Sequence, residues 1–257
     1  ALYFSLSALM ILLLSLLAFA PSSSKKEVSL TKDLATSFVN NQANDFISDF
    51  SGTENVKALP FDFTAPQNIP DKANYFTDGK KKCYKDSTIE VTMWSEKIVK
   101  YGTKLFFADI KIKHPSQFRR QWSHGDYSST KNQYPTTMFA NSHGVVGMSA
   151  DFYKHRKYGI IVQYGTLLCD KRTGHPLDVL VVDYDGNFHI WDDKKLSAHI
   201  KENGTDDIML SFTFGPALVI DGKETKLSAK RYENHILGEL DQVVGRAAIG
   251  QLGELHY

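Results

Sequence analysis

A serine and an aspartate lie close together in the stretch GMSAD, residues 147–151, and each suits a different kind of catalysis. A hydrolase serine on a nucleophile elbow requires the pattern G-x-S-x-G, because the strained turn needs small residues on both sides of the serine. The last position here is an aspartate, so Ser149 is a poor candidate for the attacking group. A carboxylate can attack, activate water or stabilise developing positive charge. Asp151 is therefore the stronger candidate.

Asp151 opens a cluster of chemically capable side chains, because Tyr153, His155 and Arg156 follow it within one short segment. The apolar residues 145–148 predict a strand that would carry this cluster to a sheet edge. Loops at strand ends are common places for binding and catalytic residues. A solvated surface loop has the same composition, so the residues alone leave both interpretations open.

The sequence predicts neither a metal site nor a cofactor. Its histidines have no HxH or HExxH spacing, and Cys83 and Cys169 lie in no zinc-type pattern. The stretch DYDGN, residues 183–187, resembles the start of a calcium loop, but its twelfth position is Lys194 where an EF-hand has glutamate. A hairpin turn is the better interpretation. The cysteines are expected as free thiols, with a disulfide as the alternative in an exported protein.

Charge and composition exclude one large class of function. The chain of 257 residues carries 30 Lys and Arg against 29 Asp and Glu, so its net charge is +1. A general nucleic-acid binder needs a dense basic surface to neutralise phosphates, and this balance argues against one. Any recognition of anions must therefore be local. With 42% hydrophobic residues, the chain has enough apolar material for a core.

The N-terminal region predicts a membrane segment. Residues 2–20 contain no charged residue, and as a helix they would be about 28 Å long, close to the thickness of the bilayer's hydrocarbon core. We interpret residues 1–24 as an uncleaved transmembrane anchor. A cleaved signal peptide is the alternative, but Pro21 would follow the cut. The expected location is the cell membrane, single-pass, with the following domain on the extracellular side.

Residues 25–86 are expected to connect this anchor to a folded domain. Apolar residues recur at helical spacing in residues 30–50, which predicts an amphipathic stalk helix. Residues 53–86 contain several prolines and a lysine run, which is typical of an extended linker.

From residue 88 onward the chain consists of short β-type runs separated by glycine turns. Strands are expected at residues 88–99, 104–112, 145–148, 159–164, 166–169, 179–183 and 188–191. Helices are expected at residues 115–122 and 134–141. The expected fold class is α+β, a mainly antiparallel sheet with a few helices, preceded by the N-terminal transmembrane helix and the helical stalk.

Four ordered segments of this region resemble the phosphodiester glycosidase family, most closely its bacterial members of clostridial type. The first is FANSHGVVGMSADFYKHRKYGIIVQYGTLL, and the others are DVLVVDYDGNFHIW, LSFTFGPALVIDGK and VGRAAIGQLGELHY. The resemblance therefore assigns residues 87–257 to one domain of this family.

The resemblance implies a hydrolase that cleaves the anomeric bond of a glycosyl 1-phosphodiester in envelope or extracellular glycans, such as an exopolysaccharide. It needs no cofactor, and its partners would be the glycan substrate and, through the N-terminal helix, the membrane. The carboxylate would serve the sugar and guanidinium groups the phosphate. The implied catalytic residues are Asp151 and Arg246, and the implied substrate-binding residues are Tyr153, Arg156, Gly215 and Pro216.

The chain departs from the family pattern in three places. Ser149-Ala150 stands where many members have Asn-Gly, and Gly245 stands where a proline usually precedes the arginine. The family pattern also continues beyond Tyr257 into a glycine-rich acidic loop, so the sequence is expected to be C-terminally incomplete. These departures leave one alternative from another class, a non-catalytic glycan-binding or envelope-assembly module of the same fold.

Overall fold

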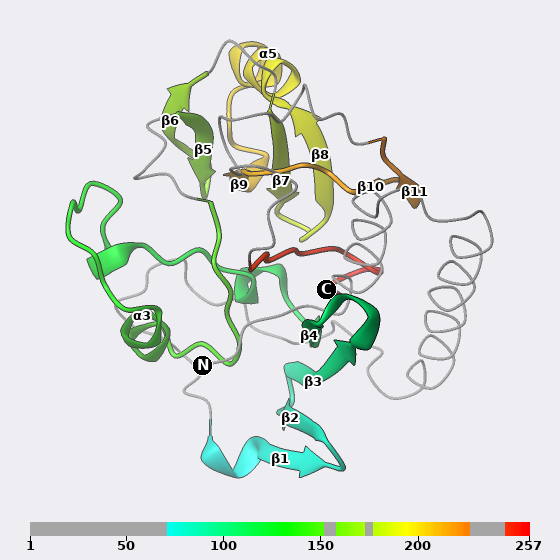
Figure 1. The fold of residues 1–257 in the computed structure, drawn as a ribbon. Helices are drawn as coiled ribbons and strands as arrows, with labels where there is room; N and C mark the ends of the chain where they lie inside the picture. Colours follow the sequence, from blue (N-terminus) through cyan, green and yellow to red (C-terminus); the bar gives the residue numbers. More distant parts are fainter. Residues whose placement is uncertain (1–70, 152–157, 173–176, 227–244) are drawn as a thin grey trace.

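The computed structural model describes residues 71–151, 158–172, 177–226 and 245–257 (Figure 1). The expected transmembrane segment, residues 1–24, and the expected stalk helix, residues 30–50, lie outside the described residues. Within the described ranges, no helix is both long enough and apolar enough to cross a membrane.

The first sheet has four antiparallel strands in the order β1-β2-β3-β4. After the 3₁₀ turn η1 (Lys72–Asn74), its strands are β1 (Tyr75–Asp78), β2 (Lys81–Lys85), β3 (Ile89–Ile98) and β4 (Thr103–Ile112). Strands β3 and β4 pair along their whole length and are joined by η2 (Val99–Tyr101) and Gly102. Leu105 and Phe107 of β4 are buried, whereas Lys104 and Phe106 between and before them are more exposed, so one face of this hairpin packs inward.

Residues 71–86 were expected to belong to an extended linker, and this expectation is wrong for that part. They form the hairpin β1–β2, which continues the sheet through β3. The carboxylate of Asp86 fixes the β2–β3 turn, because it accepts hydrogen bonds from the backbone of Thr88 at 2.7 Å and of Ile89 at 2.8 Å. Burial alone would raise the pKa of Asp86, but hydrogen bonds from Tyr84 and this backbone outweigh it and lower the pKa.

The second sheet has five antiparallel strands in the order β6-β5-β9-β7-β8. They are β5 (Gly159–Gln163), β6 (Thr166–Lys171), β7 (Asp178–Asp183), β8 (Phe188–Asp192) and β9 (Ile208–Thr213). Strand β9, the last of these five in sequence, lies in the centre of the sheet, and every one of its residues is buried. A central strand is buried at consecutive positions when both faces of the sheet are covered.

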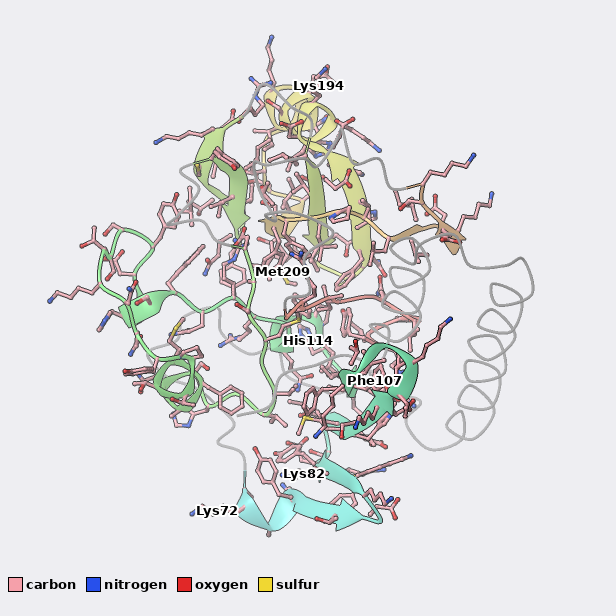
Figure 2. All side chains as sticks on the ribbon, in the orientation of Figure 1. Lys72, Lys82, Phe107, His114, Lys194 and Met209 are labelled. Atoms are coloured by element: carbon pink, nitrogen blue, oxygen red, sulfur yellow. The ribbon has the colours of Figure 1, made fainter. Side chains whose placement is uncertain are left out.

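Two apolar layers cover the faces of this sheet. On one face, helix α5 (Asp193–Asn203) contributes Leu196 to a core shared with Val179 and Val181 of β7. On the other face, Met209 and Phe212 pack in a second core that Phe118 and Phe188 border. Figure 2 places Met209 in the middle of the molecule, with Lys194 of α5 and Lys72 at opposite ends.

The C-terminal residues join the two sheets. Ile110 and Tyr257 exchange two backbone hydrogen bonds of 2.8 Å, so the segment lies along β4. The ring of Tyr257 packs against Phe188, and its hydroxyl donates to the carbonyl of Gly186 at 2.7 Å. His256 adds a contact of 2.5 Å from Nε2 to Oδ1 of Asp109.

The short hairpin of β10 (Val219–Ile220) and β11 (Lys223–Glu224) forms the third sheet.

The helices agree only in part with expectation. Helix α3 (Pro135–Asn141) lies where a helix was expected, whereas residues 115–122 contain only η3 (Pro115–Gln117) and are followed by η4 (Ser123–Gly125). The side chains of His114 and Gln117 form a capping box at the N-terminal end of η3. The expected strand at residues 145–148 is irregular. Helix α5 was not expected, because few apolar residues mark its inner face.

The expected fold class, with one main antiparallel sheet, is therefore wrong. The described residues form three separate antiparallel sheets and two α-helices. The antiparallel character and the small share of helix were correctly predicted. The difference arises because the C-terminal residues and β9, which are distant in sequence from their partners, decide how the hairpins assemble.

Candidate functional site

The side chain of Asp151 is buried in an ion pair with Arg120. Nη2 of Arg120 lies 3.3 Å from Oδ2 of Asp151, and the two side chains are 2% and 4% exposed. The guanidinium also lies 4.0 Å from the ring centre of Phe212 and 4.9 Å from that of Trp122. A buried charge is tolerated when it is paired and hydrogen-bonded. The pair thus explains how an aspartate is accommodated at this position.

Strand β9 holds both members of the pair. Nη2 of Arg120 donates to the carbonyl of Ser211 at 2.5 Å, and the N–H of Thr213 donates to Oδ2 of Asp151 at 3.2 Å. Arg120 and Asp151 thus contact each other, and each also bonds to the backbone of β9. Because the carboxylate is bound from two directions, its rotation is restricted.

Both contacts of Asp151 use the same oxygen. Oδ2 receives the guanidinium and the backbone amide, whereas no hydrogen bond from the described residues reaches Oδ1. An ionised carboxylate has acceptor capacity on both oxygens. Among the described residues, the carboxylate is therefore anchored through Oδ2, and Oδ1 has acceptor capacity for a further partner.

Side-chain hydroxyls replace backbone acceptors where β5 meets β9. The N–H of Ile160 donates to Oγ1 of Thr213 at 3.0 Å, and the N–H of Val162 donates to Oγ of Ser211 at 2.7 Å. Gly159 permits this approach, because its φ is 134° and a Cβ atom there would lie 3.0 Å from Oγ1 of Thr213. The same β9 residues that hold the ion pair thus also set the spacing of the two strands.

The predicted Gly215–Pro216 turn follows β9 directly, and its peptide bond is cis. A Cβ atom at Gly215 would lie 3.4 Å from Cβ of Asp178, so the turn passes close to the start of β7. The N–H of Ala217 donates to Oδ2 of Asp178 at 2.9 Å. Asp178 is 7% exposed. Buried carboxylates therefore fix the backbone at the end of β9 and again just after the turn.

Of the three remaining predicted site residues, the structure describes only Arg246. Tyr153 and Arg156 lie outside the described residues. Arg246 is exposed, in the irregular stretch that precedes the C-terminal segment. The guanidinium that pairs with Asp151 belongs to Arg120. Convergence of Asp151 with Arg156 and Arg246 stays a prediction.

A neutral phenol lies close to the arginines of this region. Burial raises the pKa of Tyr164 to about 12, although the positive charges of Arg119 and Arg120 act in the opposite direction. Burial lowers the pKa of Arg119, whose Nε donates to the carbonyl of Ser116 at 2.9 Å. Tyr164 therefore contributes a protonated hydroxyl rather than a negative charge at neutral pH.

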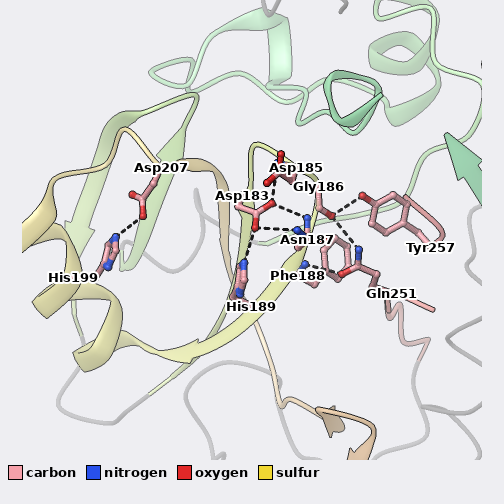
Figure 3. Close-up of polar contacts among 10 residues, drawn as sticks. All are labelled: Asp183, Asp185, Gly186, Asn187, Phe188, His189, His199, Asp207, Gln251 and Tyr257. Atoms are coloured by element: carbon pink, nitrogen blue, oxygen red, sulfur yellow. Dashed lines mark hydrogen bonds and ion pairs between the residues drawn. The ribbon is translucent and has the colours of Figure 1, made fainter. Parts of the chain in front are cut away.

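A second group of ionisable side chains lies at the β7–β8 hairpin (Figure 3). Nε2 of His189 lies 2.8 Å from Oδ2 of Asp183, and the N–H of Asn187 donates to Oδ1 of Asp183 at 2.8 Å. Burial alone would raise the pKa of Asp183, but the hydrogen bonds from His189 and Asn187 outweigh it and lower the pKa. On α5, Nε2 of His199 lies 2.8 Å from Oδ2 of Asp207.

These pairs do not combine into a metal site. Within the described part of the chain, no three His, Cys, Asp or Glu side chains gather closely enough to hold a metal ion. The DYDGN stretch forms the predicted hairpin turn, with Gly186 at φ 83°. Cys83 and Cys169, in separate sheets, are both free thiols. The best candidate site in the described residues remains the group around Asp151.

Neither Arg120 nor Asp178 was predicted from the sequence as a site residue. Arg120 lies 31 residues before Asp151, and no local pattern connects the two. The available signal was an arginine between Phe118 and Trp122, since aromatic neighbours favour a stacked guanidinium. Asp178 is the first residue of one resembling segment, but no local pattern marks a carboxylate at the start of a buried strand as a site residue.

Comparison with known proteins identifies no relative: no family model matches the chain, and neither a curated protein nor a solved structure shows significant similarity to it.

Proposed function

We propose that this protein is a hydrolase that cleaves the anomeric bond of a glycosyl 1-phosphodiester, as its resemblance to phosphodiester glycosidases implies. The observation that carries the proposal is the carboxylate of Asp151, which is anchored through Oδ2 by Arg120 and Thr213. It lies in the longest of the resembling segments. The proposed substrates are envelope or extracellular glycans.

The chemistry of the bond explains why one well-held carboxylate matters. Cleavage at the anomeric carbon develops oxocarbenium character on the sugar, which a carboxylate stabilises, attacks or serves by activating water. The carbon–oxygen bond breaks, the phosphate monoester leaves with the bonding electrons, and water supplies the new hydroxyl of the sugar. A phosphate monoester is far less basic than a sugar alkoxide, so the reaction needs less help from a general acid.

The negative charge of the phosphodiester requires a cationic partner. Arg120 does not serve this purpose, because its side chain is 2% exposed and its Nη2 already contacts Asp151 and Ser211. We assign the phosphate to Arg156 and Arg246, the two arginines of the resembling segments. The planar guanidinium matches two phosphate oxygens at once.

The burial of Asp151 also favours one alternative. A carboxylate that is only 4% exposed and bound by a guanidinium can be a purely structural element. The protein would then be a non-catalytic glycan-binding or envelope-assembly module that keeps the fold. This alternative predicts that a glycosyl phosphodiester is bound and remains intact.

The test uses methyl diesters of several hexose 1-phosphates, incubated with the full chain and with Asp151→Asn. The hydrolase releases free reducing sugar and methyl phosphate, and Asp151→Asn lowers kcat by a factor of about 100 or more. Circular dichroism at the assay temperature checks that the variant is folded. A ligand that binds without release of sugar supports the alternative, and release that is equal in both proteins rejects the role of Asp151.

A further inference from the structure

We propose that Arg120 is a positioning residue for the reaction, which holds the carboxylate of Asp151 so that Oδ1 faces the substrate. This inference rests on the proposed function and adds a residue that the resemblance does not supply. It starts from the direction of the contacts: Nη2 of Arg120 lies 3.3 Å from Oδ2 of Asp151, the same oxygen that accepts from the N–H of Thr213.

The guanidinium is itself held rigidly. Phe212 lies 4.0 Å from its central carbon and Trp122 lies 4.9 Å away, measured to the ring centres. The carbonyl of Ser211 accepts from Nη2 at 2.5 Å. A planar cation that is packed against aromatic rings loses most of its rotational freedom. Arg120 therefore presents Nη2 to Asp151 from a fixed place.

The anchor is shared with the strand that leads to the predicted substrate turn. Thr213, whose N–H donates to Oδ2 of Asp151, ends β9 shortly before Gly215–Pro216. Ser211, whose carbonyl accepts from Arg120, also bonds β5 through its hydroxyl. A displacement of the guanidinium would thus move the carboxylate relative to the turn.

A displacement of this kind changes kcat more than substrate binding. A shift of about 1 Å in a reacting group lowers the rate by a factor of about 100, while the contacts that bind the rest of the substrate remain. We expect kcat for a hexose 1-phosphate methyl diester to fall by a factor of about 100 in Arg120→Ala, with KM changed less than about threefold.

Chemical rescue separates positioning from a general role in the fold. Arg120→Ala leaves a space beside Phe212 and Trp122 that has the shape of a guanidinium. Added methylguanidinium should restore at least a tenth of the lost kcat in a saturable manner, whereas methylammonium at the same concentration should not. Arg119→Lys is the matched control, since Arg119 is its neighbour in sequence, contacts Ser116 instead and should keep the activity of the parent protein.

The outcomes distinguish the two proposals. If the parent protein hydrolyses none of the diesters, the proposed function fails and this inference falls with it. If the parent protein is active and Arg120→Ala keeps its kcat, only the positioning role is wrong. If Arg120→Ala is inactive and unfolded, the same measurements are made on Arg120→Lys, which keeps the charge. A folded Arg120→Lys with an unchanged kcat likewise overturns the proposal, and a selective fall in kcat supports it.

Discussion

Two acid–base pairs in this molecule have similar partners and different surroundings. Arg120 and Asp151 are 2% and 4% exposed, whereas His189 and Asp183 are 43% and 27% exposed. The first pair links segments that are 31 residues apart, and the second joins neighbouring strands of one hairpin. Burial removes the competition of water, so the first pair is the stronger determinant of structure and the second a modest one.

The difference also separates the two places as functional candidates. The side chain of Asp151 is held by groups from distant parts of the chain, and one of its oxygens has no hydrogen bond from the described residues. Both oxygens of Asp183 accept hydrogen bonds within its own hairpin, from Asn187 and His189. A carboxylate whose acceptors are all engaged locally shapes a turn. The buried pair is therefore the place where we expect chemistry.

The largest expected effect on stability concerns the buried pair. Asp151→Ala leaves a buried guanidinium without its carboxylate and should lower the free energy of unfolding by about 3–5 kcal/mol. The double variant Arg120→Met/Asp151→Leu removes both charges and should recover most of this loss. Urea denaturation measures all three proteins. Equal losses in the single and double variants would show that packing, rather than charge, is responsible.

A second prediction concerns the tip of the β7–β8 hairpin, where we expect packing against the C-terminal segment to contribute more to stability than the ion pair of His189 and Asp183. A Cβ atom at Gly186 would lie 2.6 Å from the hydroxyl of Tyr257 and 2.7 Å from Cδ2 of Leu255, and φ is 83°. Gly186→Ala should therefore destabilise the fold by about 2–4 kcal/mol. Gly102→Ala, at φ 62° with open space, should cost about 1 kcal/mol. Thermal unfolding compares the two, and a reversed order contradicts the packing of the C-terminal segment.

The smallest expected effect concerns the exposed pair. Asp183→Asn should lower the stability at pH 7 by at most about 1 kcal/mol, because water screens the contact with His189. The folded state lowers the pKa of Asp183, so its contribution is present above the unfolded pKa of about 4 and is lost as the pH falls through the lower folded value. The stabilities of the parent protein and Asp183→Asn, measured from pH 7 to pH 2, should converge at acid pH. A difference that grows at acid pH would reverse the assigned sign.

Local patterns predicted the hairpins well. The Asp185-Gly186 turn and the strands on either side of Gly102 and Gly165 were recognised from glycine positions and β-type runs. Local patterns failed where contacts between distant segments decide. The apolar residues 145–148 are irregular, and residues 71–86 form strands because β3 supplies their partner.

The candidate site shows the same division. Asp151 was selected because of its neighbours in the sequence, and the structure adds what sequence periodicity does not report, namely the side chains that reach it across the fold. Arg120 and Asp178 acquire their importance only through β9 and the turn after it. Sequence could indicate the carboxylate, but not the guanidinium that holds it.

The most direct test of the account is a single comparison of sugar release from hexose 1-phosphate methyl diesters by the parent protein, by Asp151→Asn and by the charge-free variant Arg120→Met/Asp151→Leu. The account predicts steady release by the parent protein and release that is slower by a factor of about 100 or more with either variant, each of them folded at the assay temperature. Undiminished release by a folded protein that lacks the carboxylate at position 151, or intact diesters with every protein, would contradict it.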